Sequence, residues 1–216
     1  MNSRERILAR IRKSQGRGGR PAPAEHAAID AYLRAHPRGT LPGVEADRVA
    51  RFRSRAESML STCDEIAGLV EFPAAVARYL RAGNLPLSGC MWPHLADLDW
   101  KGAGLALEPR AARDGDAVGV TGVFAAIAET GTLMLASGPD TPATVSLLPE
   151  THVAIVPAAR IVAHMEDAWG LARTEFGDLP RVANFISGPS RTADIDQQIV
   201  LGAHGPYRVH IVILRG

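Results

Sequence analysis

Several residue types that would point directly to a function are scarce in this sequence of 216 residues. It has only two cysteines, Cys63 and Cys90, and no CxxC pair, which argues against a disulfide framework and against an iron–sulfur cluster held by this chain alone. No apolar run approaches the ~18 residues of a membrane-spanning helix. Residues 1–6 lack the apolar core of a secretory signal. We therefore expect a cytoplasmic protein without membrane insertion.

Strong charge of either sign is also missing, since the formal net charge is +1. This balance argues against a protein that coats nucleic acid. Residues 1–20 hold seven basic side chains and one acid, and the pattern there predicts a helix over 2–13 with Asn2 as its N-cap. A flexible Gly/Pro linker is expected over 14–24. A solvated arm or a docking segment for a partner protein is favoured over contact with RNA or an anionic membrane.

The remaining sequence predicts one α/β domain over residues 47–216, preceded by an N-terminal region of residues 1–46 that holds the basic helix, the linker and a connecting segment. Strands alternate with helices, and this order favours βαβ units and a mainly parallel sheet. A tight helical turn is expected over 125–128, and a helix could begin within 192–201. The other expected helices are 47–60, 73–81 and 159–173, and the expected strands are 65–70, 85–87, 104–107, 132–136, 153–156, 182–186 and 207–214.

Two of the expected strands end in the same tripeptide. Ser-Gly-Pro follows the strand 132–136 at 137–139, and it follows the strand 182–186 at 187–189. Small polar residues beyond the carboxyl ends of strands line the ligand crevice of open α/β sheets, and parallel neighbours present those ends at one edge. We therefore expect one pocket. The candidate ligand-binding residues are Thr121, Thr130, Gly131, Thr132, Ser137, Gly138, Ser187, Gly188, Ser190, Arg191, Thr192, Asp194 and His204.

Glu129 is the candidate catalytic residue, because it stands between an alanine-rich stretch and a threonine pair flanking Gly131. A carboxylate in a cleft is suited to proton transfer, or to nucleophilic attack on an acyl group. The alternative is that Glu129 accepts backbone N–H groups of the 130–132 turn and only fixes this loop.

Arg191 is the candidate anion-binding residue. The segment 187–192 combines hydroxyls, a guanidinium and a glycine, which suits a carboxylate or a phosphate. A helix starting at Thr192 would direct its amino end at the same anion. A surface arginine beside a capped helix is the alternative, and His204 is either a donor to the substrate or a turn residue. No P-loop and no GxGxxG fingerprint is present, so NAD or FAD bound by this chain is not expected.

The other histidines are dispersed along the chain. His94, His152 and His164 have no spacing typical of a metal site, so no metal is expected. The favoured interpretations are a loop residue, a strand-end residue and a solvated helix face, respectively.

Five segments in order resemble the lactate-utilisation (LUD) domain family, and most of all its lactate utilisation protein C (LutC)-like branch. They are residues 126–133 (AIAETGTL), 146–149 (SLLP), 153–161 (VAIVPAARI), 187–195 (SGPSRTADI) and 202–206 (GAHGP), within a likeness that covers about 45–214. The resemblance implies a three-layer, mostly parallel twisted sheet flanked by helices, similar to the NagB/RpiA/CoA-transferase-like fold, with the N-terminal helix as an extension.

The resemblance also implies a pathway. Members of this family work with two iron–sulfur proteins in oxidising L-lactate to pyruvate. Since this chain lacks the cysteine-rich tail of a second branch, we expect no cofactor in it and iron–sulfur clusters on partner proteins. We therefore expect an accessory subunit, non-catalytic or partner-dependent, that binds a small anionic ligand or bridges redox partners. The alternative is an independent enzyme for an acyl-CoA or a sugar phosphate that uses Glu129. A nucleic-acid-binding regulator is the least favoured.

Overall fold

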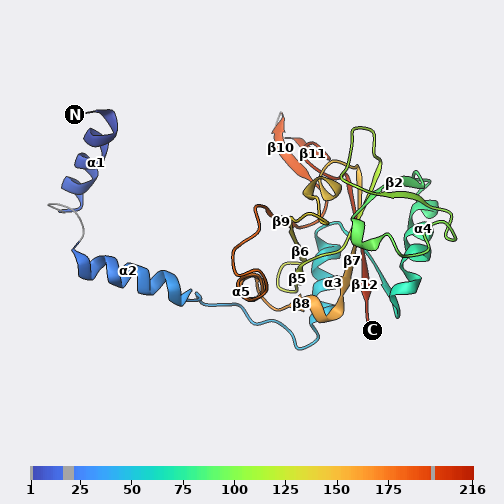
Figure 1. Ribbon diagram of the computed structural model, residues 1–216, viewed down its shortest axis with the longest axis horizontal. Coiled ribbons are helices and arrows are strands. Elements are labelled where there is room, and N and C mark those ends of the chain that lie inside the picture. The colour runs from blue at the N-terminus through green and yellow to red at the C-terminus, as the bar shows by residue number, and fades with distance from the viewer. Residues whose placement is uncertain (1, 17–21, 196–197) are drawn as a thin grey trace. The chain divides into compact units, whose positions relative to one another are not determined.

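The computed structural model describes residues 2–16, 22–195 and 198–216 (Figure 1), and the chain divides into two compact units, Met1–Leu41 and Pro42–Gly216. The first unit holds α1 (Ser3–Ser14) and α2 (Pro23–Ala35), with no buried residue in either helix. The expected cap of α1 is confirmed, because Asn2 Oδ1 accepts the Glu5 N–H and Glu5 Oε2 accepts the Asn2 N–H, both at 2.9 Å.

The end of the linker expected over 14–24 is wrong, because α2 already begins at Pro23. Proline is well suited to the first turn of a helix, and the Glu25 carboxylate accepts the Ala22 N–H at 2.9 Å. The middle of that linker, residues 17–21, lies outside the described residues.

The second unit is built on a six-stranded sheet in the order β1-β12-β7-β4-β2-β3, and all of its strand pairs are parallel. Its central strands are apolar runs buried on both faces, as parallel sheets require. The expected α/β fold with a mostly parallel sheet is confirmed. The strands are β1 (Thr62–Ile66), β2 (Ser88–Met91), β3 (Ala106–Pro109), β4 (Val118–Thr121), β7 (Thr151–Pro157) and β12 (Arg208–Leu214).

Two amphipathic helices cover this sheet. In α4 (Phe72–Ala82), Phe72, Val76 and Leu80 recur on one face and are fully buried. In α3 (Arg48–Ser58), Phe52 and Ala56 are buried, and the Asp47 side chain caps the helix by accepting the Ala50 N–H at 2.9 Å. Because α3 contacts both β1 and the β8 strand of a second sheet, it joins the two sheets.

The second sheet is smaller and mixed. Its order is β8 (Ile161–Val162), β5 (Ala125–Ile127), β6 (Thr132–Ala136) and β9 (Ala183–Ile186), with β6 antiparallel to both β5 and β9. One face, with Ala126 and Leu133, belongs to the main core, whereas the other, with Ile127 and Met134, packs against α5 (Met165–Phe176). The mixed sheet is therefore covered on one face by the main core and on the other by α5.

A two-stranded antiparallel hairpin, β10 (Arg191–Ile195) and β11 (Gln198–Leu201), completes the strands. In Figure 1 it projects from the domain at the end opposite the C-terminus. The helix expected within 192–201 is therefore wrong. The strand pairing uses the β-branched Thr192 opposite Val200, residue types that favour strands.

Several other predicted elements differ from the structure in type or in their bounds. The helical turn expected over 125–128 is strand β5, because its alanines are fully buried between two layers and tertiary packing overrides their helix propensity. The strand expected at 85–87 is β2, which begins at Ser88, since Asn84 turns the chain with a φ of +50° and Pro86 has no N–H to donate. The strand expected at 65–70 ends at Ile66, and the helix expected from 159 begins at Met165. Short 3₁₀ turns occupy Leu69–Glu71, Pro93–Leu95, Ala143–Ser146 and Ala158–Arg160.

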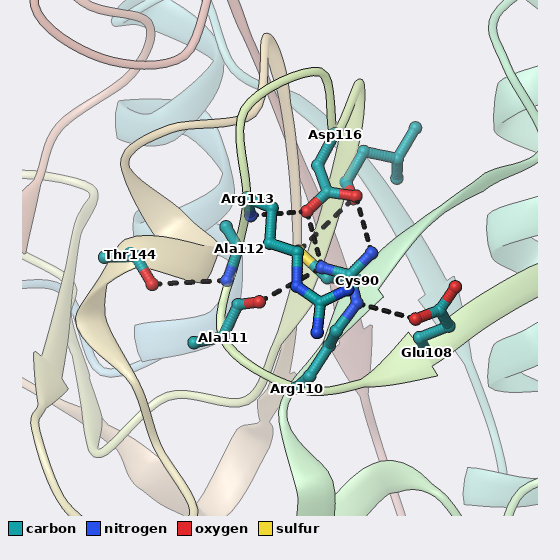
Figure 2. Close-up of polar contacts among 9 residues, drawn as sticks. Cys90, Glu108, Arg110, Ala111, Ala112, Arg113, Asp116 and Thr144 are labelled. Carbon is teal, nitrogen blue, oxygen red and sulfur yellow. Dashed lines mark hydrogen bonds and ion pairs between the residues drawn. The ribbon is translucent and has the colours of Figure 1, made fainter.

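The connection between β3 and β4, residues 110–117, contains no helix and is held by ionic contacts instead (Figure 2). Arg110 grips Asp116 with two nitrogens, at 2.7 and 2.9 Å, and its Nε contacts the Glu108 carboxylate at 2.7 Å. The Arg110 guanidinium lowers the pKa of Asp116 to about 2. Nearby, burial raises the pKa of the Cys90 thiol to about 12. This cluster therefore fixes a loop, and it holds its cysteine protonated and unreactive.

Candidate functional site

Two glycines in the candidate site allow its backbone to pack closely against the end of α3. Gly131, in the β5–β6 turn, has a φ of +69°, and a Cβ there would lie 2.6 Å from the Arg55 carbonyl carbon. Gly188, just after β9, has a φ of +73°, and its Cβ would overlap the Met59 carbonyl oxygen. Only glycine combines this conformation with this approach. The β5–β6 turn and the segment after β9 therefore both pack against one helix end.

The same packing brings three hydroxyl groups into a row, which we call the hydroxyl chain: Thr130, Thr132 and Ser187. Thr130 Oγ1 lies 2.7 Å from Thr132 Oγ1, which is in turn hydrogen-bonded to Ser187 Oγ. The contact follows from the antiparallel β6–β9 register, since Leu133 lies opposite Ile186 and each neighbour therefore faces the other. A hydroxyl both donates and accepts, so the row can orient a polar group at its end.

Glu129 is paired with a histidine. Its Oε2 lies 2.9 Å from His164 Nδ1, and the side chains are 27% and 13% exposed, respectively. The backbone fixes both residues, because the Glu129 N–H donates to the Ala163 carbonyl and the His164 N–H donates to the Asp167 carboxylate, each at 3.0 Å. A carboxylate on one ring nitrogen orients the imidazole and leaves the other nitrogen for proton transfer.

The position of His164 corrects the interpretation of a solvated helix face. His164 is the residue before α5, and its side chain points to Glu129 instead of lying on the helix surface. The local signal was the His-x-x-Asp spacing at the start of the helix, which places His164 at the N-cap. Its pairing with Glu129, 35 positions away, has no local signal.

Arg191 lines a cavity of about 360 Å³ together with the second Ser-Gly-Pro turn, and we call this cavity the Arg191 pocket. Ser190 joins its walls, because its N–H donates to the Pro206 carbonyl at 2.9 Å and its Oγ accepts the His204 N–H at 3.2 Å. The lining residues are Leu147, Phe185, Ile186, Ser187, Gly188, Pro189, Ser190, Arg191, His204, Gly205 and Pro206.

Five of the predicted ligand-binding residues thus lie around one cavity: Ser187, Gly188, Ser190, Arg191 and His204. Ser187 is also the last member of the hydroxyl chain, so it links the Glu129 turn to the Arg191 pocket. The cavity lies at the amino-terminal edge of the parallel sheet, because Leu147 and Pro206 precede β7 and β12. The expectation of a crevice at the carboxyl edge is wrong for these residues.

Ser137 and Gly138 lie elsewhere. Because β6 and β9 are antiparallel, the first Ser-Gly-Pro turn falls at the opposite end of this strand pair from the second. There Ser137 Oγ accepts the Val182 N–H at 3.0 Å, and both residues line a different cavity. The parallel arrangement on which the single-pocket prediction was based is therefore wrong.

The last three candidates have other surroundings. Thr121 is buried in the parallel sheet, with its Oγ1 2.8 Å from His152 Nε2. Thr192 lies in β10 opposite Val200, and Asp194 lies in the same strand, with a side chain outside the described residues.

Two buried histidines belong to the core and not to the site. His152 bonds Thr121, and His210 Nδ1 lies 2.8 Å from Thr62 Oγ1, with the ring of Tyr79 stacked on it at 3.8 Å. Burial lowers the pKa of His152 to about 4, and burial also lowers the pKa of His210 to about 4. Both rings are therefore neutral at pH 7.

Residues 2–16, 22–195 and 198–216 contain no group of three or more His, Cys, Asp or Glu side chains that could hold a metal ion. In the same ranges, no helix is both long and apolar enough to span a membrane.

A profile of the LUD domain matches residues 110–214. Among curated relatives, lactate utilization protein C of Bacillus licheniformis is 33% identical over 149 residues, which are 66% of this chain and 62% of that protein. The same-named proteins of Bacillus subtilis and Exiguobacterium sp. are 39% and 41% identical over 100 residues, which are 45% of this chain and 42% and 44% of those proteins. The matched segments thus span less than two thirds of the length of each of these relatives.

The fold likewise has a solved counterpart, the 1.70 Å crystal structure of a DUF162 family protein from Deinococcus radiodurans. The TM-score is 0.58 at 21% identity, over 81% of this chain and 100% of that one, which is a likeness of fold. The sequence matches carry the likeness: residues 110–214 match the LUD domain family, and the chain is similar to lactate utilization protein C.

Proposed function

We propose that this chain serves lactate utilisation as an accessory component that binds a small carboxylate, lactate or pyruvate, in the Arg191 pocket. The pathway is supported by the relatives named lactate utilization protein C. The proposed carboxylate ligand is supported by the position of Ser187, which ends the hydroxyl chain and lines the pocket together with Arg191.

The chemistry of the pocket suits a 2-hydroxy or 2-oxo acid. The Arg191 guanidinium offers a planar fork that matches the two oxygens of a carboxylate. Hydrogen bonds to a charged group contribute about 1.5–3 kcal/mol each. Ser187 and Ser190 also line the pocket, and a serine hydroxyl can donate to, or accept from, the oxygen at C2.

Oxidation of lactate to pyruvate removes two electrons and two protons, and in this proposal the electrons pass to iron–sulfur clusters on partner proteins. The described residues offer no cluster-binding set of the four ligands that such clusters take. Burial raises the pKa of Cys63 to about 12, so this half-buried thiol is protonated at neutral pH. The contribution of this chain is therefore to hold the acid and to place it near the partner.

A second candidate function is favoured by the Glu129–His164 pair. A carboxylate bonded to an imidazole at 2.9 Å is an arrangement for general acid–base catalysis, and it fits an independent enzyme acting on an acyl-CoA or a sugar phosphate. The two proposals differ in what Glu129 does. In the first it only orients His164, whereas in the second its carboxylate is essential for turnover.

Calorimetric titration of the full chain with lactate and with pyruvate tests the first proposal. We expect Arg191→Ala to weaken binding roughly 10- to 150-fold, the equivalent of one or more charged hydrogen bonds of about 1.5–3 kcal/mol. Arg191→Lys should weaken it nearly as much, because lysine keeps the charge and loses the fork. The matched control is Arg181→Ala, an exposed arginine that does not line the pocket.

Equal affinities of the wild type and both Arg191 variants for lactate and pyruvate would refute the proposal that Arg191 binds the carboxylate. Acyl transfer from acetyl-CoA by the chain alone, abolished in Glu129→Gln, would instead establish the second function. Recovery of iron–sulfur proteins with the tagged chain from its own cells supports the accessory role, and recovery of the chain without them contradicts it.

A further inference from the structure

The direction in which the chain winds through the parallel sheet reverses between β2 and β4. From β2 the chain continues to β3 at the sheet edge, whereas from β4 it continues, through the mixed sheet, to β7 on the other side. β2 and β4 are hydrogen-bonded neighbours, with Cys90 opposite Gly119. In open α/β sheets, such a reversal leaves a crevice beyond the carboxyl ends of the two strands, where ligands bind.

A cavity of about 250 Å³ lies at this point, and we call it the switch-point pocket. Trp92 and His94 follow β2, Val123 and Phe124 follow β4, Ser137 follows β6 and Phe176 ends α5; all six line the cavity. None of them lines the Arg191 pocket, which lies at the opposite, amino-terminal edge of the sheet. The two cavities are therefore separate.

Four of the nine residues that line the cavity carry aromatic rings, and contacts within the fold hold these rings in place. The Trp92 ring is almost fully buried, and its indole N–H donates to the Pro142 carbonyl at 3.1 Å. The rings of Phe124 and Phe176 lie 4.7 Å apart. Gly122 keeps room for the imidazole, because a Cβ at this position would lie 3.2 Å from His94 Nε2.

The polar side chains that line the pocket are few: the exposed His94, Ser137 and Thr141. No lining side chain is a carboxylate, a guanidinium or an ammonium group. Ser137 Oγ accepts the Val182 N–H, so its own O–H remains to donate. The pocket therefore favours a neutral molecule that has a hydrogen-bond acceptor.

From the topology and this lining we infer that the switch-point pocket binds an uncharged planar molecule of one or two fused rings carrying a carbonyl or similar acceptor. Planarity follows from the aromatic walls, since flat rings stack on them in offset or edge-to-face contacts. The size follows from the volume, because 250 Å³ is below the roughly 300–1,000 Å³ of pockets for drug-sized ligands. The site is independent of the proposed carboxylate function.

Titration of the full chain with coumarin, an uncharged two-ring lactone, followed by calorimetry, tests this site. We expect saturable one-to-one binding that is unchanged by saturating lactate. Decalone, a two-ring ketone without a flat ring, should bind several-fold more weakly. Val123→Trp, which fills the pocket, should abolish binding.

Phe176→Ala provides a second variant, at the end of α5, where the residue is 41% exposed. Loss of one aromatic contact should weaken coumarin roughly 2- to 12-fold, the equivalent of about 0.5–1.5 kcal/mol. The matched control is Tyr207→Ala, a ring that is 45% exposed and lies outside the pocket.

Unsaturable titration of the wild type, equal affinity for decalone, or unchanged affinity in both pocket variants would overturn the inference. Competition by lactate would also overturn it, because it would assign coumarin to the Arg191 pocket. Failure of lactate to bind at all leaves the coumarin result intact, so the two proposals fail separately.

Discussion

Replacing Gly188 by alanine tests whether the close contact between the end of α3 and the segment after β9 requires a glycine. Gly188 has a φ of +73°, and an alanine Cβ would overlap the Met59 carbonyl oxygen. The left-handed conformation costs about 1–2 kcal/mol for a residue with a Cβ. Forcing extra volume into packed structure costs about 1–3 kcal/mol more. We therefore expect Gly188→Ala to lower the free energy of unfolding by about 2–5 kcal/mol.

The matched control is Gly115→Ala. Gly115 has a φ of +86° but nothing within 4 Å of its would-be Cβ, so it should lose only the conformational part, about 1–2 kcal/mol. The gain from restricting the unfolded chain is common to both variants and cancels between them. The difference between the two measures the close approach of α3 alone.

Urea unfolding followed by tryptophan fluorescence is the appropriate assay. Trp92, Trp100 and Trp169 all lie in the second unit, so the signal reports that unit and not the N-terminal helices. The slopes of the unfolding curves should be equal, which makes the midpoints comparable. Equal losses in the two variants, within about 0.5 kcal/mol, would refute the argument that the α3 contact requires glycine.

Two further predictions concern pH. Asp116→Asn should lower the free energy of unfolding by about 1–3 kcal/mol at pH 7. Because the pKa of Asp116 is lowered from 3.8 to about 2, this difference between wild type and variant should persist above pH 3.8 and vanish as pH falls through about 2. Glu108→Gln removes a 65% exposed partner of the same Arg110 and should lower the free energy of unfolding by less than about 1 kcal/mol. Equal losses in the two variants would contradict the role of the paired Arg110–Asp116 hydrogen bonds. The pKa values of His152 and His210 lie at about 4 in the folded state, so between pH 6.5 and 4 the unfolded chain binds the extra protons. The free energy of unfolding should therefore fall on acidification by up to about 1.4 kcal/mol per pH unit for each histidine, and His152→Gln or His210→Gln should flatten this slope; an unchanged slope in both would contradict the neutral, buried state.

The helices that cover the parallel sheet were predictable because their signals are local. Asp47 caps α3, and Pro73 stands in the first turn of α4, so both helices follow from the residues at their starts. The alanines of β5 and the residues of the β10–β11 hairpin have no such signal. Their strand conformation depends on what they pack against or pair with, which a local pattern does not contain.

The candidate site likewise has a part that was predictable from neighbouring residues and a part that depends on the chain path. Ser187, Ser190 and Arg191 are close in sequence, and the structure places them around one cavity. The separation of Ser137 from them could not be read from the residues, because strand direction depends on the chain path and not on the strand sequence. The pairing of Glu129 with His164 likewise depends on the parallel β5–β8 contact, which brings together segments far apart in the chain.

The position of β12 has a consequence for the order in which the domain forms. β1 is near the start of the domain, yet its only partner in the six-stranded sheet is β12, with Thr62 paired to His210. During synthesis β12 leaves the ribosome after all the other described strands, so β1 cannot join the sheet until then. Such distant pairing requires a large loop closure and slows folding. The hydrogen-bonding edges of β1 and β7 that β12 occupies therefore remain unpaired until β12 has been synthesised, and unpaired strand edges expose the chain to aggregation.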